Sequence, residues 1–345
     1  MSDQATSDKP VVLLRPAPQV IERIFSHDAL RRLKERYTVI DGEADPSEAA
    51  IDACLSDVFA IIGQPDLPAE RLLRAPRLRG ILNVEGNFFQ NVDYDVAFSR
   101  GVNVVACMPV YAPAVAEHAL GLAIDLARGI SREDRAFREG RERYVSAGNQ
   151  DAILLRGSEM GILGYGNIGR RLLPLLVPFR PSRIRCYDPW LPDAVIRDAG
   201  MEPANLEETL STSTFLFILA TVTEESTHLL NAENMKLIPA GARVVLSSRA
   251  AVVDFEALVR YAAEGRFLCG TDVWPEEPAP PDHPARRVEG MVLSAHRAGG
   301  IPSAFHEIGE MVLDDLDLMA RGLPPVRNQL AARELVTRYR SRPVE

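Results

Sequence analysis

With 345 residues, the chain is long enough for two domains, and 46% hydrophobic with 25% charged residues predicts a globular protein with a full core. A net charge of −9 without a long basic block disfavours nucleic acid and anionic membranes as main partners. The cysteines are widely spaced and form no C-x-x-C, which indicates free thiols in a reducing compartment: Cys54, Cys107, Cys186 and Cys269. We therefore expect a cytoplasmic protein with no metal site and no apolar run long enough to span a bilayer.

The first part of the chain alternates β-rich runs with helical patterns. Strands are expected at 11–14, 37–40, 58–62, 80–84 and 102–106. Helices are expected at 19–37, 47–55 and 67–75. This alternation predicts a doubly wound parallel sheet. Because this unit has no glycine fingerprint, we interpret it as the substrate half of the molecule.

The middle of the chain predicts a long apolar helix. Pro109 and Pro113 are expected to end the first unit. Residues 114–129 then follow a helical pattern that is apolar around most of its circumference, which predicts burial on several sides. A subunit interface would provide such burial, so helix 114–127 is a candidate interface of a homodimer. The charged segment 131–143 is expected to be a solvated helix or arm.

The second unit repeats the alternation. Strands are expected at 159–163, 183–187, 214–220, 242–247, 267–270 and 290–293. Helices are expected at 205–210, 231–237 and 254–265, with Asp254 as N-cap and Gly265 as the stop. A last helix, 303–319, is expected to return to the first unit, and 321–345 to form a short charged tail. The predicted domains are 1–112, completed by 301–345, and 113–300.

The strand at 159–163 leads into the hexapeptide Gly164-Tyr165-Gly166-Asn167-Ile168-Gly169. A strand, a G-x-G-x-x-G turn, a helix and a strand ending in an acidic residue predict a dinucleotide-binding βαβ unit. Gly164 would allow the tight turn, Gly166 the close approach of a pyrophosphate and Gly169 close helix packing. Asp188, 19 residues past Gly169, is placed to bind ribose hydroxyls. Pro174 lies inside the predicted helix, where we expect a kink.

Three polar residues follow strands of the second unit, at the edge where open α/β sheets bind ligands. Arg249 could hold a carboxylate with two hydrogen bonds, His296 could exchange a proton near neutral pH, and Glu277 could orient that histidine. The alternative for each residue alone is a surface charge or a satisfied structural group.

These features resemble the NAD-dependent D-2-hydroxyacid dehydrogenases, the family of phosphoglycerate, glycerate and D-lactate dehydrogenases. The resemblance spans about residues 11–322. Besides the glycine turn with Asp188, it rests on Gly86-Asn87-Phe88 with Asn91-Val92-Asp93, Val115-Ala116-Glu117, Arg249 with Val253-Asp254, Asp272-Val273-Trp274 with Glu277-Pro278, and His296 with Gly299-Gly300.

The resemblance implies two Rossmann-like domains with an active-site cleft between them, a two-fold dimer and hydride transfer between NAD and C2 of a 2-hydroxy or 2-oxo acid. It implies catalytic roles for Arg249, Glu277 and His296. Asp272 would contact the nicotinamide carboxamide. Backbone N–H groups around Gly86, Asn87 and Phe88 would hold the substrate carboxylate.

Several positions depart from the family pattern and leave the 2-hydroxy acid open. Phe88 replaces a glycine and is followed by Phe89; these rings could wall a pocket, stack on a substrate or pack in the core. Glu85 adds negative charge beside a loop expected to attract carboxylates. Ala250, Thr221 and Arg297 are further departures. The alternatives are an NAD-binding co-repressor on the same fold and a phosphite-type dehydrogenase; Glu277 disfavours a formate enzyme, which would carry Gln there.

Overall fold

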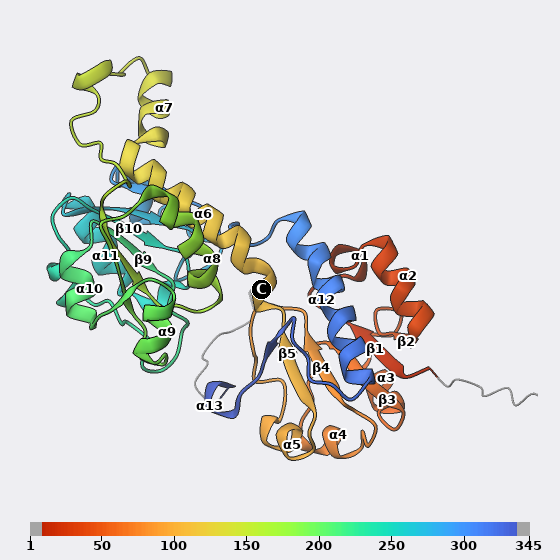
Figure 1. Cartoon of the computed structure of the whole chain (residues 1–345). Helices are drawn as coiled ribbons and strands as arrows, with labels where there is room; N and C mark the ends of the chain where they lie inside the picture. The colour runs from red at the N-terminus through yellow and green to blue at the C-terminus, as the bar shows by residue number, and fades with distance from the viewer. Residues whose placement is uncertain (1–8, 337–345) are drawn as a thin grey trace, which may run out of the picture. The chain divides into compact units, whose positions relative to one another are not determined.

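A computed structural model of the protein describes residues 9–336. The chain divides into two compact units (Figure 1). Unit 1 comprises Met1–Tyr111 and Gly300–Glu345, and unit 2 comprises Ala112–Gly299. Both units are α/β structures built on a largely parallel sheet, as the sequence predicted.

The sheet of unit 1 has the strand order β13-β5-β4-β3-β1-β2. Its strands are β1 (Val11–Arg15), β2 (Thr38–Asp41), β3 (Val58–Gly63), β4 (Gly80–Asn83), β5 (Asn103–Ala106) and β13 (Gln329–Leu330). The first five pair in parallel, and β13 adds antiparallel to β5. The prediction of a short charged tail over 321–345 was therefore wrong for its described part, while residues 337–345 lie outside the described residues. A two-residue strand has no alternation that a sequence pattern could reveal.

A buried carboxylate explains how this last segment reaches the sheet. Asp315, fully buried in α12 (Pro302–Ala320), accepts hydrogen bonds from the backbone N–H groups of Val326, Arg327 and Asn328 at 2.7 to 2.9 Å. Hydrogen bonds to a buried charge are among the stronger ones in a protein, so Asp315 fixes the turn that leads into β13.

Helices cover both faces of this sheet. They are α1 (Ile21–Ile24), α2 (His27–Arg36), α3 (Glu48–Cys54), α4 (Ala69–Leu73), α5 (Tyr94–Ser99), α12 and α13 (Arg333–Val336). One core cluster joins the sheet to α1, α2 and α12, and a second joins its other face to α3, α4 and α5. The single helix expected over 19–37 is two helices, because Phe25 is extended and the Ser26 hydroxyl caps α2 by accepting from Ala29 N–H.

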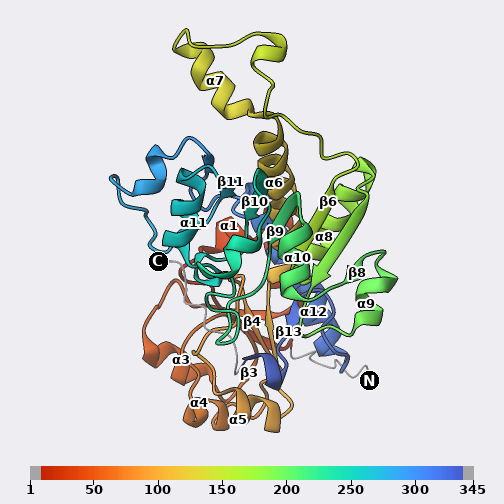
Figure 2. The ribbon, with the colours of Figure 1, turned by 90° about the vertical axis from the view of Figure 1, so that its left-hand side faces the viewer.

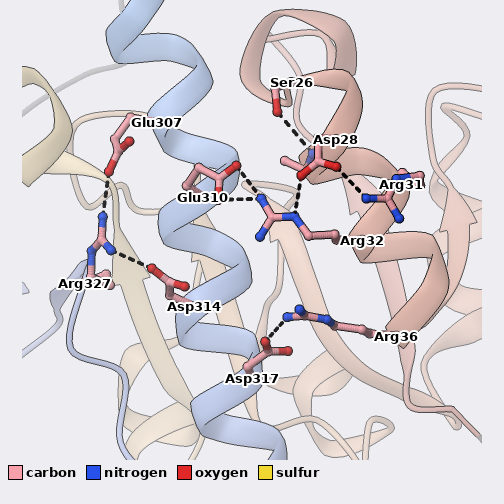
Figure 3. Close-up of polar contacts among 11 residues, drawn as sticks. Ser26, Asp28, Arg31, Arg32, Arg36, Glu307, Glu310, Asp314, Asp317 and Arg327 are labelled. Carbon is pink, nitrogen blue, oxygen red and sulfur yellow. Dashed lines mark hydrogen bonds and ion pairs between the residues drawn. The ribbon is translucent and has the colours of Figure 1, made fainter.

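Charged side chains connect α2 with α12 across the surface of unit 1 (Figure 3). Arg32 binds both carboxylate oxygens of Glu310, at 2.5 and 2.6 Å, and also contacts Asp28. Arg36 pairs with Asp317 one turn further along. These pairs are partly exposed, so each contributes at most about 1 kcal/mol, and the buried apolar contacts of α12 dominate its packing.

The sheet of unit 2 has the order β12-β11-β10-β9-β6-β7-β8, with all neighbours parallel. Its strands are β6 (Glu159–Leu163), β7 (Arg183–Tyr187), β8 (Glu202–Pro203), β9 (Phe215–Ile218), β10 (Ala242–Leu246), β11 (Phe267–Thr271) and β12 (Met291–Leu293). The six predicted strands are confirmed, and the short β8 was missed. The order reverses between β6 and β9, which is where doubly wound sheets bind ligands.

The helices of unit 2 pack on both faces of this sheet. They are α6 (Met108–Arg128, which begins in unit 1), α8 (Asn167–Leu176), α9 (Asp193–Asp198), α10 (Leu206–Thr212) and α11 (Phe255–Ala263). The further helix α7 (Ile130–Arg138) has no buried residue and projects away from the sheet (Figure 1). The predicted cap is confirmed, since Asp254 accepts from Ala257 N–H at 3.0 Å, and Gly265 has a φ of 73°. The expected helix 231–237 is only a 3-10 turn at Asn234–Leu237. Helix α8 continues past Pro174 to Leu176 and is followed by a 3-10 turn at Val177–Phe179.

Helix α6 corrects two expectations. It begins before Pro109 and contains Pro113, so the prolines do not precede the helix as expected, although the first unit does end between them, at Tyr111; Pro109 lies in the first turn, where a missing N–H breaks no helical bond. By length and composition α6 could also cross a membrane, although no such run was expected. Its apolar side chains instead pack against β6 and β9 and α8 in the core of unit 2, as the helix of a globular core does.

Candidate active site

The glycine turn between β6 and α8 has the geometry that a nucleotide phosphate requires. Gly164 has a φ of 93°, and a Cβ there would lie 2.7 Å from Cα of Ala220. A Cβ on Gly169 would lie 2.9 Å from the carbonyl oxygen of Gly164, so the helix packs closely on the turn. Gly166 faces open space and caps α8 without a side-chain hydrogen bond. No side chain of Gly166 covers the start of α8. The first backbone N–H groups of this helix can therefore bind a phosphate directly.

Asp188 closes this turn from the end of β7. Its carboxylate accepts from the backbone N–H of Tyr165 at 2.8 Å and from that of Trp190 at 3.0 Å. Each oxygen keeps a lone pair for a further donor. A carboxylate so fixed beside the glycine turn fits the ribose hydroxyls of a dinucleotide. The residues of this turn thus fit the predicted cofactor.

Glu277 and His296 lie in direct contact. Oε2 of Glu277 is 2.6 Å from Nδ1 of His296, and both side chains are about a quarter exposed. The other carboxylate oxygen accepts from the backbone N–H of Trp274 at 3.0 Å. With Nδ1 directed at Glu277, the opposite ring nitrogen is available to exchange a proton with a ligand.

Asp272 holds the backbone of the histidine loop. Its carboxylate, 2% exposed, accepts from the N–H groups of Arg297 at 3.0 Å and Ala298 at 2.9 Å. Its carbonyl oxygen accepts from His296 N–H at 2.7 Å. These bonds stabilise the left-handed backbone of His296, whose φ is 48°. Sequence reasoning missed His118 of α6, whose Nε2 lies 3.9 Å from the same carboxylate; only its position beside the Val115-Ala116-Glu117 motif could have suggested it.

Arg249 leaves the neighbouring strand. It follows β10 in extended backbone, is partly buried, and donates from Nη1 to the carbonyl of Ser248 at 2.8 Å. Residues Leu246, Thr271 and Leu293 are register partners at the carboxyl ends of β10, β11 and β12. The three predicted catalytic residues therefore leave one edge of the sheet from adjacent strands, and the structure brings two of them into contact.

The predicted substrate loop follows β4 in unit 1. Asn87 and Phe88 are buried, and the Phe88 ring packs in the core on one face of the sheet. Of the three roles considered for this ring, the structure therefore shows core packing. A Cβ on Gly86 would lie 3.2 Å from the Tyr111 ring, so this position favours glycine. Phe89 is also buried, at 7% exposed, so neither ring is displayed as a binding surface.

Glu85 directly precedes this loop and places a carboxylate beside it. Gln19 donates from Nε2 to Oε1 of Glu85 at 2.6 Å. Burial, and then the charge of Glu85, raises the pKa of the Cys107 thiol. Glu85 thus acts electrostatically on its surroundings beside the loop.

A glycine turn of the dinucleotide-binding form and a carboxylate–histidine contact at neighbouring strand ends suit a nicotinamide-dependent dehydrogenase. Residues 120–298 match the family model described as "D-isomer specific 2-hydroxyacid dehydrogenase, NAD binding domain". The chain is 31% identical over 314 residues to glyoxylate reductase of Korarchaeum cryptofilum, covering 88% of this chain and 93% of that protein. The chain belongs to the D-2-hydroxyacid dehydrogenase family and is an NAD-dependent enzyme.

Other relatives carry different substrate names. A crystal structure titled as a phosphoglycerate oxidoreductase from Rhizobium etli shares 45% identity and a TM-score of 0.85, covering 94% of this chain and 99% of that one. D-3-phosphoglycerate dehydrogenase of Archaeoglobus fulgidus is 28% identical over 274 residues, which are 79% of this chain and 51% of that protein. The family is therefore shared, while the named substrates differ.

Proposed function

We propose that the enzyme reversibly reduces a small 2-oxo acid to its 2-hydroxy acid, with Arg249, Glu277 and His296 as the catalytic residues. The observation that carries this proposal is the 2.6 Å contact between Glu277 and His296 at the edge of a dinucleotide-binding sheet.

His296 is the general acid and base of this proposal. In reduction its outward ring nitrogen gives a proton to the carbonyl oxygen of the substrate, and in oxidation it takes the proton back from the hydroxyl. Glu277 orients the ring through Nδ1 and stabilises the positive charge of the protonated imidazole.

Arg249 is the proposed carboxylate clamp. Its planar guanidinium can form two parallel hydrogen bonds with a carboxylate, and its charge polarises the neighbouring carbonyl group. We further propose that the backbone N–H groups of Gly86, Asn87 and Phe88 bind a carboxylate of the substrate. The burial of the Phe88 ring supports this role, because it fixes the loop backbone.

The cofactor is held by residues 164–169 and Asp188. Backbone N–H groups at the start of α8 would receive the pyrophosphate, and Asp188 the adenosine ribose. NAD, when bound, supplies or accepts the hydride. Each carboxylate oxygen of Asp272 accepts one backbone N–H and keeps a further lone pair. With these lone pairs Asp272 would contact the nicotinamide carboxamide.

Glyoxylate or hydroxypyruvate is the proposed substrate class. Relatives named glyoxylate reductase and hydroxypyruvate reductase support it, the latter from Thermotoga maritima at 28% identity over 258 residues. Glu85 supports it further, because a fixed negative charge beside the carboxylate loop opposes a substrate with an additional phosphate.

A panel of substrates tests this proposal. Purified enzyme is mixed with NADH and, separately, glyoxylate, hydroxypyruvate, pyruvate and phosphohydroxypyruvate, and NADH absorbance is followed. We expect the fastest turnover with one of the first two. NAD reduction by phosphite, or NADH binding without turnover of any acid, would instead favour the phosphite-dehydrogenase or the co-repressor alternative.

We also propose that the enzyme is a cytoplasmic homodimer. Burial raises the pKa of Cys186 and Cys269 to about 12, and all four cysteines are free and buried, as suits a reducing compartment. The dimer proposal is supported by a projecting arm, residues 129–154, that extends beyond α6 and includes α7 (Figure 2). Its exposed apolar side chains suit contact with a second copy; they are Ile130, Phe137, Tyr144, Val145 and Leu154.

A further inference from the structure

Trp274 contacts Glu277 and the segment that precedes His296. Its backbone N–H donates to Oε1 of Glu277 at 3.0 Å. Its indole Nε1–H donates to the carbonyl oxygen of Ser294 at 2.8 Å. Ser294 lies two residues before His296, in the segment that carries the histidine away from β12. One residue thus connects the Glu277 carboxylate to the backbone that presents His296.

The indole ring is itself held in place. It is partly buried against the core of unit 2. Its centroid lies 5.7 Å from that of Phe255 and 5.3 Å from that of His283, the latter edge to face at 81°. Aromatic contacts of this kind restrict the ring to one orientation. The direction of its N–H is therefore fixed by packing as well as by the hydrogen bond.

We propose that Trp274 is a positioning residue, whose indole N–H sets the distance and orientation of His296 relative to Glu277. This inference rests on the catalytic roles proposed above for these two residues. Trp274 needs no contact with substrate or cofactor for this role. It acts through the carbonyl of Ser294 on the histidine segment and through its own N–H on the Glu277 carboxylate.

Two of the supports of His296 are independent of the indole. Asp272 binds the backbone on the far side of the histidine, at residues 296–298, and the backbone N–H of Trp274 survives any substitution except proline. Loss of the indole N–H should therefore shift the imidazole without releasing it. A misplacement of about 1 Å can lower a rate by up to about 100-fold, so an intermediate loss is expected.

The test compares Trp274→Phe with a matched control, Tyr261→Phe. The first variant removes the indole N–H and keeps an aromatic ring. The control removes a hydrogen bond of equal length in the same core, from the Tyr261 hydroxyl to the Ala232 carbonyl at 2.8 Å, distant in sequence from the pair. Each change removes one hydrogen bond and should leave the enzyme folded. The measurements are kcat and KM for the accepted 2-oxo acid, NADH affinity by fluorescence, and the solvent deuterium isotope effect on kcat.

For Trp274→Phe we expect kcat to fall about 10-fold, with KM and NADH affinity within about twofold of wild type. The solvent isotope effect should rise, because a displaced imidazole makes proton transfer more rate-limiting. Tyr261→Phe should leave all four quantities near wild type. A wild-type kcat in Trp274→Phe, or an equal loss in both variants, would overturn the proposal.

A second substitution separates the N–H from ring shape. Site-specific replacement of Trp274 by 3-benzothienylalanine keeps a bicyclic ring and removes the donor. It should reproduce the loss of kcat, whereas recovery to wild type would show that shape alone matters and would overturn the proposal. His296→Ala distinguishes failure of the Trp274 proposal from failure of the proposed function. If His296→Ala keeps wild-type activity, the catalytic assignment of His296 fails. If His296→Ala is impaired while both Trp274 replacements are active, only the role of Trp274 fails.

Discussion

Tyr165 and Asp188, on the glycine turn and at the end of the next strand, are joined by a 2.8 Å hydrogen bond from the backbone N–H of the first to the carboxylate of the second. The carboxylate predicted to select the cofactor therefore also holds the loop that is predicted to receive its phosphates. These two roles would be lost together if Asp188 were replaced.

Asp188→Ala should narrow the preference for NADH over NADPH, because a 2′-phosphate would no longer meet a fixed negative charge. It should also weaken NADH binding itself, by about 10-fold, since the bond to Tyr165 disappears and hydrogen bonds to charged groups contribute about 1.5–3 kcal/mol. Titration with both cofactors, followed by their fluorescence, measures this. Equal use of NADH and NADPH by the wild type would contradict the placement of Asp188.

His296→Ala should lower kcat/KM by about 10²- to 10⁴-fold in both directions, the usual range for a lost general acid and base. Glu277→Gln keeps the size of the partner and removes its charge. It should lower the rate of reduction by about 10- to 100-fold, matching the 1.5–3 kcal/mol of a charged hydrogen bond. Steady-state assays in both directions give these values, and full activity of either variant would remove the pair from the mechanism.

Arg249→Lys should lower kcat/KM by about 10- to 100-fold, because an ammonium group does not reproduce the planar two-point contact with a carboxylate. The substrate offers a complementary test. The methyl ester or the amide of an accepted 2-oxo acid should react much more slowly than the acid with wild-type enzyme. Similar turnover of acid and amide would indicate that no carboxylate clamp operates.

Glu85→Gln should favour substrates with more negative charge. Removing the carboxylate relieves roughly 1 kcal/mol of repulsion per added charge, and a phosphate adds about 1.5 to 2 charges. The ratio of kcat/KM for phosphohydroxypyruvate to that for hydroxypyruvate should therefore rise about 10- to 30-fold. The bond from Gln19 can be kept by the glutamine oxygen. An unchanged ratio of the two substrates would show that Glu85 does not influence the substrate site.

Light scattering should report about twice the 38.0 kDa chain mass at micromolar concentration. Phe137→Asp, on the exposed arm, should shift the mass toward the monomer, since Phe137 is 62% exposed in the single chain. Leu73→Asp is a suitable control, because Leu73 is equally exposed, at 66%, but lies on α4 of unit 1. A wild-type monomer would refute the dimer proposal.

Sequence patterns predicted most of the strands because parallel strands buried on both faces are rich in apolar residues, as in β3 and β9. The strands β6 and β7 begin and end at the predicted residues. The glycine turn and Asp188 were equally predictable, since each glycine has a steric reason to be there. Short elements escaped prediction: β8 and β13 have two residues each, and their pairing depends on contacts distant in sequence, such as those of Asp315.

The catalytic candidates were predictable from their positions in the sequence. The contacts that hold them in place were not. Arg249, Glu277 and His296 follow apolar strands, which a sequence displays directly. Asp272 binds three successive N–H groups of the histidine loop, and the indole N–H of Trp274 binds Ser294. Both contacts depend on the path of the loops after β11 and β12. Helix α6 packs partly in the core of its own unit, and the dimer contact predicted for residues 114–127 stays a prediction.

The position of α12 has a consequence for synthesis of the protein. Unit 1 starts the chain, yet one face of its sheet is covered by side chains of α12, including Phe305, Ile308 and Val312, that follow the whole of unit 2. A ribosome that has reached Gly299 has therefore made every residue of unit 2 but has left an apolar surface of unit 1 open. Although domains made first usually fold first, here the nucleotide-binding unit can finish folding before the unit that precedes it. Nascent chains of this enzyme should thus need protection at their first hundred residues until the last helix emerges.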